Sequence, residues 1–265
     1  MLALGLFSGT YGAMIGAGGG FIIVPILLFA YPDKSAAVIA ATSLVAVLAN
    51  GIAGAQSYAR QKRIDYKTGI MFACITIPAA IVGALVVSYI PRSIFQVVFG
   101  SLLLAVSSFI MVRPGKPAAK GEGKGSYRKI TDSEGTVYEY RVAQKLGLAF
   151  SGSIGFLAAL LGVGGGIMIM PLFITVLSVP IHIATATSQF ILVGTSLSAT
   201  ITNLAKGSLN GQWLIVLALS VGAIVGARFG AKLSQKVGST LLARALALGL
   251  MVASIRLLIA GISTL

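Results

Sequence analysis

Two glycine clusters, each inside a long apolar run, constrain this chain more than any other feature. The first reads GAGGGFIIVP at 16–25 and the second GVGGGIMIMP at 162–171. Consecutive glycines weaken a helix, and a helix that breaks inside a bilayer must turn its freed backbone groups toward protein, water or a ligand. Matching breaks in two halves of a membrane protein indicate the binding site of a transporter.

Composition supports a membrane protein. Hydrophobic residues make up 57% of the 265 residues and charged residues 10%, with a net charge of +14, and the mean hydropathy is +0.96. The basic residues collect in short gaps between apolar runs, which is typical of loops beside anionic lipid headgroups and not of a nucleic-acid interface. We therefore expect an integral, multi-pass protein of the cell (plasma) membrane that contacts lipids and binds no nucleic acid.

The apolar runs predict the topology. They cover 2–30, 35–58, 68–90, 94–112, 146–178, 181–205, 212–233 and 240–262. Most match the ~20 residues of a membrane-spanning helix, whereas the first and fifth are longer and contain the glycines. Each of these two is either one broken helix or a re-entrant pair. We divide the chain into a first transmembrane repeat at 1–112, a linker and hairpin at 113–145, and a second repeat at 146–265.

The central insert is the main soluble segment. Residues 113–125 are rich in Pro, Gly and Lys, as expected of a flexible linker. Residues 127–131 and 136–140 have strand-like composition and flank a turn that contains Gly135, which predicts a small β-hairpin. We favour a plain connector over a regulatory or partner-binding role.

The two halves repeat more than their glycines. Gly16 and Gly162 are 146 residues apart, and the Ala-Thr-Ser that ends at Ser43 recurs 145 residues later at Ser188. Ser43, Asn50 and Ser57 lie seven apart along one helix face. Their counterparts, also polar, are Ser188, Thr195 and Thr202.

The doubled Gly-x-Gly-Gly-Gly-x-x-x-x-Pro pattern, the Ala-Thr-Ser after each copy and the central insert resemble the TauE/SafE family of sulfite exporters. The resemblance covers nearly the whole chain. It implies transport of sulfite, thiosulfate, sulfonates, sulfoacetate or related small organic anions, and it identifies the family more firmly than the substrate.

Charge distribution favours one orientation. If the first and fifth runs enter and leave the membrane on one side, the halves are inverted, and most basic residues lie on the side of the insert. Those left opposite are Lys34, Arg92, Lys206 and the more deeply placed Arg256. The positive-inside rule then places the insert at 113–145 in the cytoplasm. The predicted fold class is an all-α polytopic membrane protein with two inverted repeats, Gly-broken or re-entrant helices and a small cytoplasmic β-hairpin.

The site follows from the broken helices. Free N–H groups and the positive dipole at the start of a half-helix favour an anion without a buried cation. Hydroxyl and amide side chains on the next spans complete a neutral cradle. The predicted substrate-binding residues are Gly18, Gly19, Gly20, Thr42, Ser43, Asn50, Gly164, Gly165, Gly166, Thr187, Ser188 and Gln189.

Other interpretations remain open at this point. Any single hydroxyl can bond its own helix, and Gln189 can be interhelical glue. The chain lacks GxxxxGK[ST], paired carboxylates and metal-ligand spacing, so we expect no enzyme, cofactor or metal site. A carrier with alternating access is our first hypothesis, a passive anion channel the second, and an interaction protein acting through its hairpin the third.

Overall fold

The computed structural model describes residues 1–112, 126–142, 144–234 and 239–263. The predicted linker at 113–125 lies outside the described residues. The first half consists of α1 (Leu2–Ile15), α2 (Gly20–Ala30), α3 (Ala36–Arg60), α4 (Tyr66–Val86), a short 3-10 turn (Val87–Tyr89) and α5 (Arg92–Val112). The second half consists of α6 (Gln144–Leu160), α7 (Gly166–Pro171), a π-helical turn (Leu172–Val176), α8 (Ile181–Ala205), α9 (Trp213–Leu233) and α10 (Ser239–Ile262).

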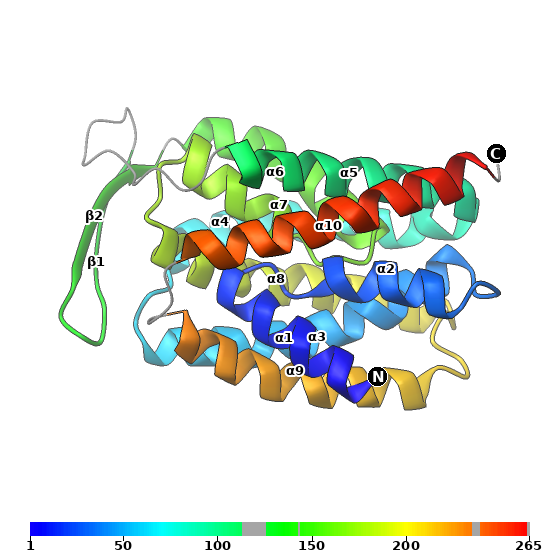
Figure 1. The fold of residues 1–265 in the computed structure, drawn as a ribbon. Helices are drawn as coiled ribbons and strands as arrows, with labels where there is room; N and C mark the ends of the chain where they lie inside the picture. The colour runs from blue at the N-terminus through cyan, green and yellow to red at the C-terminus, as the bar shows by residue number, and fades with distance from the viewer. Residues whose placement is uncertain (113–125, 143, 235–238, 264–265) are drawn as a thin grey trace.

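Each glycine cluster breaks its apolar run into two helices, as the sequence predicts. The chain also doubles back there. A Cβ placed on Gly19 would lie 2.4 Å from the carbonyl oxygen of Ser8, so the start of α2 rests against the middle of α1. In Figure 1, α2 then runs toward the end of the molecule remote from the β-hairpin, whereas α7 leads to a connection at the hairpin end.

Helix packing follows the same pattern in both halves. α1 packs on α9 as α6 packs on α4, and α3 packs on α9 as α8 packs on α4. These four pairs, like α3–α8 and α5–α10, each join a helix of one half to a helix of the other. Glycine allows the close approach: a Cβ on Gly83 would lie 2.2 Å from the oxygen of Phe156, and one on Gly230 2.1 Å from that of Thr10. Thr10 and Phe156 are 146 residues apart, so these contacts are equivalent.

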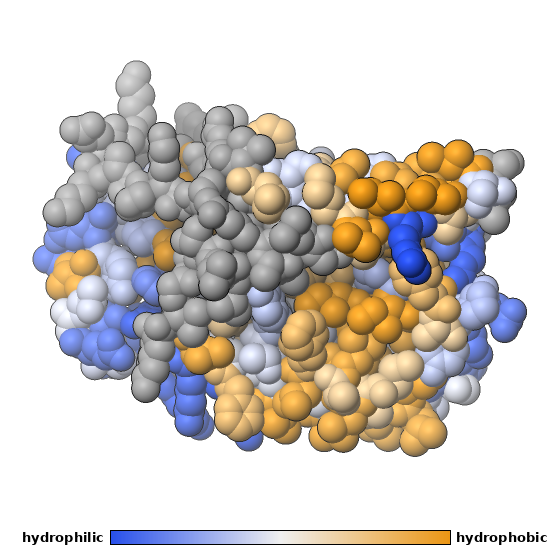
Figure 2. All heavy atoms as spheres, in the orientation of Figure 1, coloured by the Kyte–Doolittle hydropathy of each residue, from blue (hydrophilic) through white to orange (hydrophobic). Residues whose placement is uncertain are grey.

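The outer surface of the helices is apolar. Among the described residues, the helices at Ala36–Arg60, Tyr66–Tyr89 and Trp213–Leu233 are long and apolar enough to cross a membrane. On α9 the exposed side chains include Leu214, Leu217 and Val221, at the spacing of one helix face. Figure 2 shows hydrophobic side chains over the middle of the helical body and hydrophilic ones near the hairpin and at the opposite end. This distribution suits a helical body surrounded by lipid.

The hairpin predicted in the insert is present. β1 (Ser126–Thr131) pairs antiparallel with β2 (Val137–Val142), with Arg128 opposite Tyr140. Alternate side chains of β2 are buried, including Tyr140 and Val142, which join a hydrophobic cluster with Phe72, Phe173 and Ile183 of the helices. One face of the hairpin is thus part of the protein core.

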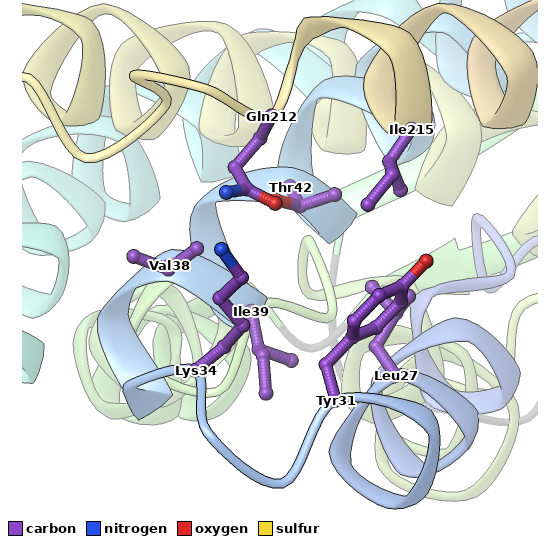
Figure 3. A pocket seen from close by; sticks show the side chains of 8 residues that line it. All are labelled: Leu27, Tyr31, Lys34, Val38, Ile39, Thr42, Gln212 and Ile215. Atoms are coloured by element: carbon purple, nitrogen blue, oxygen red, sulfur yellow. The ribbon is translucent and has the colours of Figure 1, made fainter.

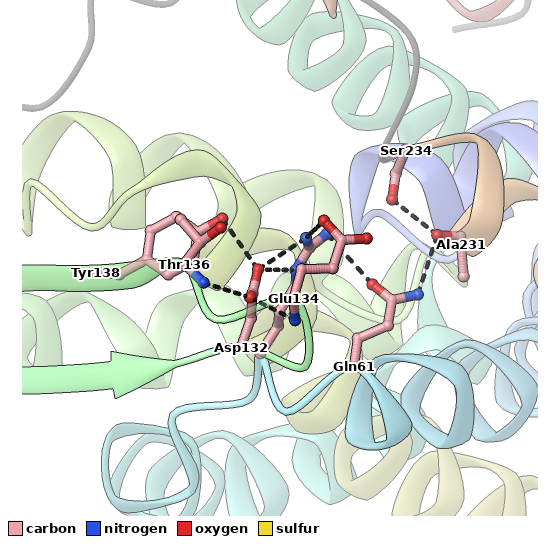
Figure 4. Close-up of polar contacts among 8 residues, drawn as sticks. Gln61, Asp132, Glu134, Thr136, Tyr138, Ala231 and Ser234 are labelled. Carbon is pink, nitrogen blue, oxygen red and sulfur yellow. Dashed lines mark hydrogen bonds and ion pairs between the residues drawn. The ribbon is translucent and has the colours of Figure 1, made fainter.

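The turn of the hairpin is fastened to the loop after α3 (Figure 4). Arg63 donates to Asp132 Oδ2 from Nε at 3.2 Å and from Nη2 at 2.9 Å, and both residues are buried. Burial opposes ionisation of Asp132, but the hydrogen bonds from Arg63 and from the Thr136 and Glu134 amides outweigh it, so its pKa lies below the usual value. Asp132 is therefore an anionic anchor at neutral pH.

Two cationic side chains at the end opposite the hairpin cap the C-termini of helices. The Arg92 guanidinium donates to the carbonyl of Leu28 at 2.5 Å, near the end of α2. The Lys206 ammonium donates to the carbonyl of Ala84 at 3.0 Å, near the end of α4. Both positions suit a cation, because helix C-termini carry free carbonyls and a partial negative charge.

Candidate functional site

The first glycine cluster forms a tight turn between α1 and α2. Its backbone is left-handed at three residues: Gly16 (φ 80°), Gly18 (φ 75°) and Gly19 (φ 80°). The Gly18 N–H donates back to the Gly12 oxygen at 3.2 Å, closing the end of α1. A residue with a Cβ rarely adopts these angles, which explains the glycine-rich sequence.

The second cluster repeats this turn at an offset of 146 residues. Gly162, Gly164 and Gly165 have φ of 74°, 77° and 91°. The Gly164 N–H donates to the Ala158 oxygen at 3.2 Å, the same distance as in the first turn. The two sequence copies thus form two copies of one structure.

The two glycine turns meet at the centre of the molecule. A Cβ on Gly20 would lie 2.8 Å from the oxygen of Gly162, and one on Gly166 would lie 2.4 Å from that of Gly16. The third helix of each half ties the turns together. Ser43 donates to the Gly162 oxygen at 2.7 Å, and its counterpart Ser188 donates to the Gly16 oxygen at 2.9 Å.

Free backbone donors lie at this junction. At the starts of α2 and α7, six backbone N–H groups donate a hydrogen bond to no acceptor among the described residues. They belong to Gly19, Gly20, Phe21, Gly165, Gly166 and Ile167. All six residues are buried. The positive end of each helix dipole therefore points into the interior, where an anion would be favoured.

Two apolar side chains fill the space between the turns. A Cβ on Gly18 would lie 2.3 Å from Leu192 Cδ1, and one on Gly164 would lie 2.4 Å from Val47 Cγ1. Val47 and Leu192 are fully buried and are themselves 145 residues apart. In this conformation the turns are sealed from solvent.

The two predicted amides bind α1. Asn50 Nδ2 donates to the Gly9 oxygen at 2.8 Å, and Gln189 Nε2 donates to the Gly12 oxygen at 3.3 Å and to Asn50 Oδ1 at 3.4 Å. They therefore hold helices together. Gln189 Oε1 is buried and receives no hydrogen bond from the described residues, so it retains a free acceptor beside α1.

The predicted threonines lie away from the turns, near opposite ends. Thr187 accepts a hydrogen bond from the Asp65 backbone N–H at 3.0 Å, below the hairpin. Thr42 lines a pocket near the opposite end instead. The structure thus brings ten of the twelve predicted residues to the turns and their supports, and separates these two.

The pocket at Thr42 opens away from the hairpin and is small: its enclosed space is about 10 Å³, enough for roughly one water molecule. We call it the outer pocket. Figure 3 shows Lys34 and Gln212 pointing toward Thr42. No ion pair joins Lys34 to a carboxylate within the described ranges. The full lining is Leu27, Tyr31, Lys34, Val38, Ile39, Thr42, Gln212 and Ile215.

Sequence reasoning did not select Lys34 or Gln212. Lys34 stands in the gap before the second apolar run and Gln212 is the first residue of the seventh, and only the fold brings them together. One sequence signal could have identified Lys34, because it is one of the few basic residues on its predicted side of the membrane. Across the described residues, no three His, Cys, Asp or Glu side chains are grouped closely enough to hold a metal ion.

Comparisons with known proteins identify similar sequences among membrane transporters. A family model described as "Sulfite exporter TauE/SafE" matches residues 1–257. The chain is 32% identical over 243 residues to the "Probable membrane transporter protein YunE" of Bacillus subtilis, covering 89% of this chain and 88% of that protein. It is 28% identical over 250 residues to the "Probable membrane transporter protein MJ0441" of Methanocaldococcus jannaschii, covering 89% and 86%.

The "Probable membrane transporter protein YdhB" of Bacillus subtilis is 25% identical, and the match covers 97% of this chain and 97% of that protein. No solved structure matches the chain. The family and these relatives are membrane transporters and not enzymes.

Proposed function

Because the chain belongs to the TauE/SafE sulfite exporter family, we propose that it is a secondary transporter that exports a small sulfur-containing anion of the sulfite, sulfonate, sulfoacetate or thiosulfate class. Alternating access moves the anion past a central site. The observation that carries this proposal is the pair of glycine turns, which aim the free N–H groups of two half-helices at one buried junction.

The glycine turns supply the charge selectivity. Gly18, Gly19 and Gly20, with Gly164, Gly165 and Gly166, let an oxyanion approach backbone N–H groups without a Cβ in the way. Ser43 and Ser188 hold the carbonyls of Gly162 and Gly16, which reduces their repulsion of an anion. Because no fixed cation takes part, the anion is held weakly enough to be released.

Two inverted repeats account for the arrangement. Equivalent helix pairs pack alike in both halves, yet the α2–α3 connection and its equivalent before α8 lie at opposite ends (Figure 1). A pseudo-two-fold axis in the membrane plane relates such repeats in many carriers. Rocking one repeat against the other then exposes the junction to each side in turn.

We place the hairpin end in the cytoplasm, beneath a bilayer that we take to be the plasma membrane. The described basic residues at that end include Arg60, Lys62, Lys67, Lys129 and Lys232. Lys34, Arg92 and Lys206 lie at the other end, and the basic residues of 113–125 and Lys236 lie outside the described residues. This asymmetry follows the positive-inside rule.

The outer pocket is the external opening of the path in this conformation. Thr42 stands next to Ser43, which holds a glycine turn. Lys34 and Gln212 therefore form a polar mouth one residue from the support of the central site. Val47 and Leu192 close the path between this mouth and the glycine N–H groups.

A ligand screen tests the substrate class. Purified protein is heated with sulfite, thiosulfate, sulfate, taurine, sulfoacetate or carboxylates, because a ligand of the native state raises its apparent melting temperature. We expect sulfite or one of the other sulfur oxyanions to give the largest rise. Stabilisation by carboxylates alone would remove sulfur chemistry from the proposal.

Counterflow separates the carrier from a passive channel. Vesicles preloaded with unlabelled sulfite should accumulate labelled sulfite transiently if a carrier exchanges the anion across the membrane. A channel would instead give conductance without such exchange. The apolar seal formed by Val47 and Leu192 favours the carrier.

A further inference from the structure

The outer pocket has a counterpart at the hairpin end. Most residues that line the pocket have an equivalent in the other half at a fixed sequence offset. The offset is 146 residues for α2, 145 for α3 and 147 for α9, and the last value comes from the equivalent contacts of Gly83 and Gly230. Seven of its eight residues then correspond, in order, to Phe173, Leu177, Ile183, Ala184, Thr187, Asp65 and Thr68. We call this set the inner groove.

The inner groove is covered more fully than the outer pocket. All seven of its residues are buried, whereas four of the pocket residues are partly exposed: Tyr31, Lys34, Val38 and Ile215. Phe173, Leu177, Ile183 and Ala184 form one hydrophobic cluster with Tyr140 and Val142 of the hairpin. Tyr140 is 3% exposed and Val142 fully buried. The hairpin therefore supplies the side chains that close this half of the molecule.

Asp65 connects the groove to the hairpin. Its Oδ2 accepts from the Tyr140 hydroxyl at 2.9 Å and lies 3.5 Å from Arg128 Nε. The same carboxylate caps α4, accepting from the Thr68 N–H at 3.0 Å. Because Gln212 is its counterpart, one half has an amide that lines the outer pocket where the other has a carboxylate covered by the hairpin.

A second set of contacts fixes the turn of the hairpin. Asp132 pairs with Arg63, and the Ser133 N–H donates to the Gln61 oxygen at 3.0 Å. These contacts join the hairpin to the loop between α3 and α4 in the first repeat, whereas Tyr140 and Val142 pack on Phe173 and Ile183 of the second repeat. The hairpin therefore bridges the two repeats, and a movement of one against the other would change its contacts.

We propose that the hairpin is the cytoplasmic gate of the transporter: Tyr140 and Val142 plug the inner groove in this conformation and must leave it for the anion to exit. This inference rests on the proposed function. It replaces our expectation that the insert is a plain connector.

Cysteine accessibility tests the plug without any transport assay. In a Cys74→Ser background, purified protein carries either Ile183→Cys in the inner groove or its outer-pocket counterpart Val38→Cys. With the native hairpin, a polar maleimide should label Val38→Cys and spare Ile183→Cys. Adding Tyr140→Ala should accelerate labelling of Ile183→Cys by about tenfold or more, because the protecting side chain is removed.

Two further variants complete the test. Tyr127→Ala removes an equally large side chain from the exposed face of the hairpin and should leave labelling unchanged. Asp132→Asn weakens the contact at the turn and leaves Tyr140 and Val142 unchanged, so it should also accelerate labelling of Ile183→Cys. It serves as the test if Tyr140→Ala does not fold. If Ile183→Cys stays protected from labelling in Asp132→Asn and in every Tyr140 variant that folds, the gate proposal is wrong.

A disulfide lock connects the plug to transport. Gln61→Cys with Ser133→Cys joins backbone segments already linked by a hydrogen bond. Oxidation should stop sulfite flux, and reduction should restore it; full flux in the oxidised form would refute gating. If the unlocked protein moves no sulfur oxyanion at all, the proposed function fails, whereas the labelling experiment still decides whether the hairpin covers the groove.

Discussion

Alanine at Gly19 and at Gly165 should have different costs, although the two glycines occupy the same place in the two turns. Their φ angles are 80° and 91°, so each alanine pays a left-handed strain of about 1–2 kcal/mol. At Gly19 the new Cβ would also lie 2.4 Å from the Ser8 carbonyl oxygen, whereas at Gly165 the nearest atom is the Ala158 Cβ at 3.2 Å. Overpacking against backbone adds about 1–3 kcal/mol.

We therefore expect Gly165→Ala to destabilise the protein by about 1–2 kcal/mol and Gly19→Ala by about 2–5 kcal/mol. At about 2–4 °C per kcal/mol, Gly19→Ala should melt some degrees below Gly165→Ala in scanning fluorimetry of purified protein. Gly135→Ala is the matched control. Its φ is 84° and nothing lies within 4 Å of its Cβ, so it reports backbone strain alone.

Equal melting temperatures for Gly19→Ala and Gly165→Ala would refute the argument from close approach. The comparison also directs the transport experiment. Gly165→Ala is the better functional probe, because it should fold and still narrow the junction. The larger changes Gly19→Leu and Gly165→Leu should abolish sulfite flux, and normal flux in both would remove the glycine turns from the site.

Three other changes test separate parts of the molecule. Ser43→Ala and Ser188→Ala each leave a buried carbonyl without its side-chain donor, so each should lower the unfolding free energy by about 1–3 kcal/mol, measured by thermal shift. Lys34→Gln should raise the half-saturating sulfite concentration at low salt, with Lys67→Gln at the hairpin end as control; an unchanged value excludes the outer pocket from the path. Because the pKa of Asp132 is depressed, its stabilising charge is present above the unfolded value and is lost as the pH falls through the folded value. Hairpin amide exchange, corrected for intrinsic rates, should therefore stay constant from about pH 8 to pH 5 and rise only below about pH 4, and Asp132→Asn should remove that dependence.

The sequence predicts those features of the fold that depend on local chemistry. Glycines with required left-handed angles mark both breaks, and strand-like residues around Gly135 mark the hairpin. The doubled spacing identifies Ser43 and Ser188 as equivalent before any contact is known. The structure gives both serines the same role, donating to a glycine carbonyl of the other half.

Tertiary features are not predictable in this way. Tyr140 resembles any other strand tyrosine in the sequence, and only docking distinguishes it from the exposed Tyr127. Asp65 and Gln212 differ in type, so no residue pattern reveals that they are equivalent. Thr42 and Thr187 were expected to share one cradle. In the structure Thr42 lies toward the outer pocket and Thr187 toward the hairpin end.

The apolar seal at the centre offers a test of substrate size. Leu192 and Val47 fill the space beside Gly18 and Gly164. If the anion passes there, as we propose, these side chains set how large it can be. Leu192→Ala should lower the unfolding free energy by about 2–5 kcal/mol and increase the flux of sulfoacetate relative to sulfite, while Leu197→Ala, on the exposed side of α8, should leave the ratio unchanged. If a folded Leu192→Ala variant keeps the native ratio, the transported anion does not pass between the two turns, and the helix dipoles act on it from a distance at most.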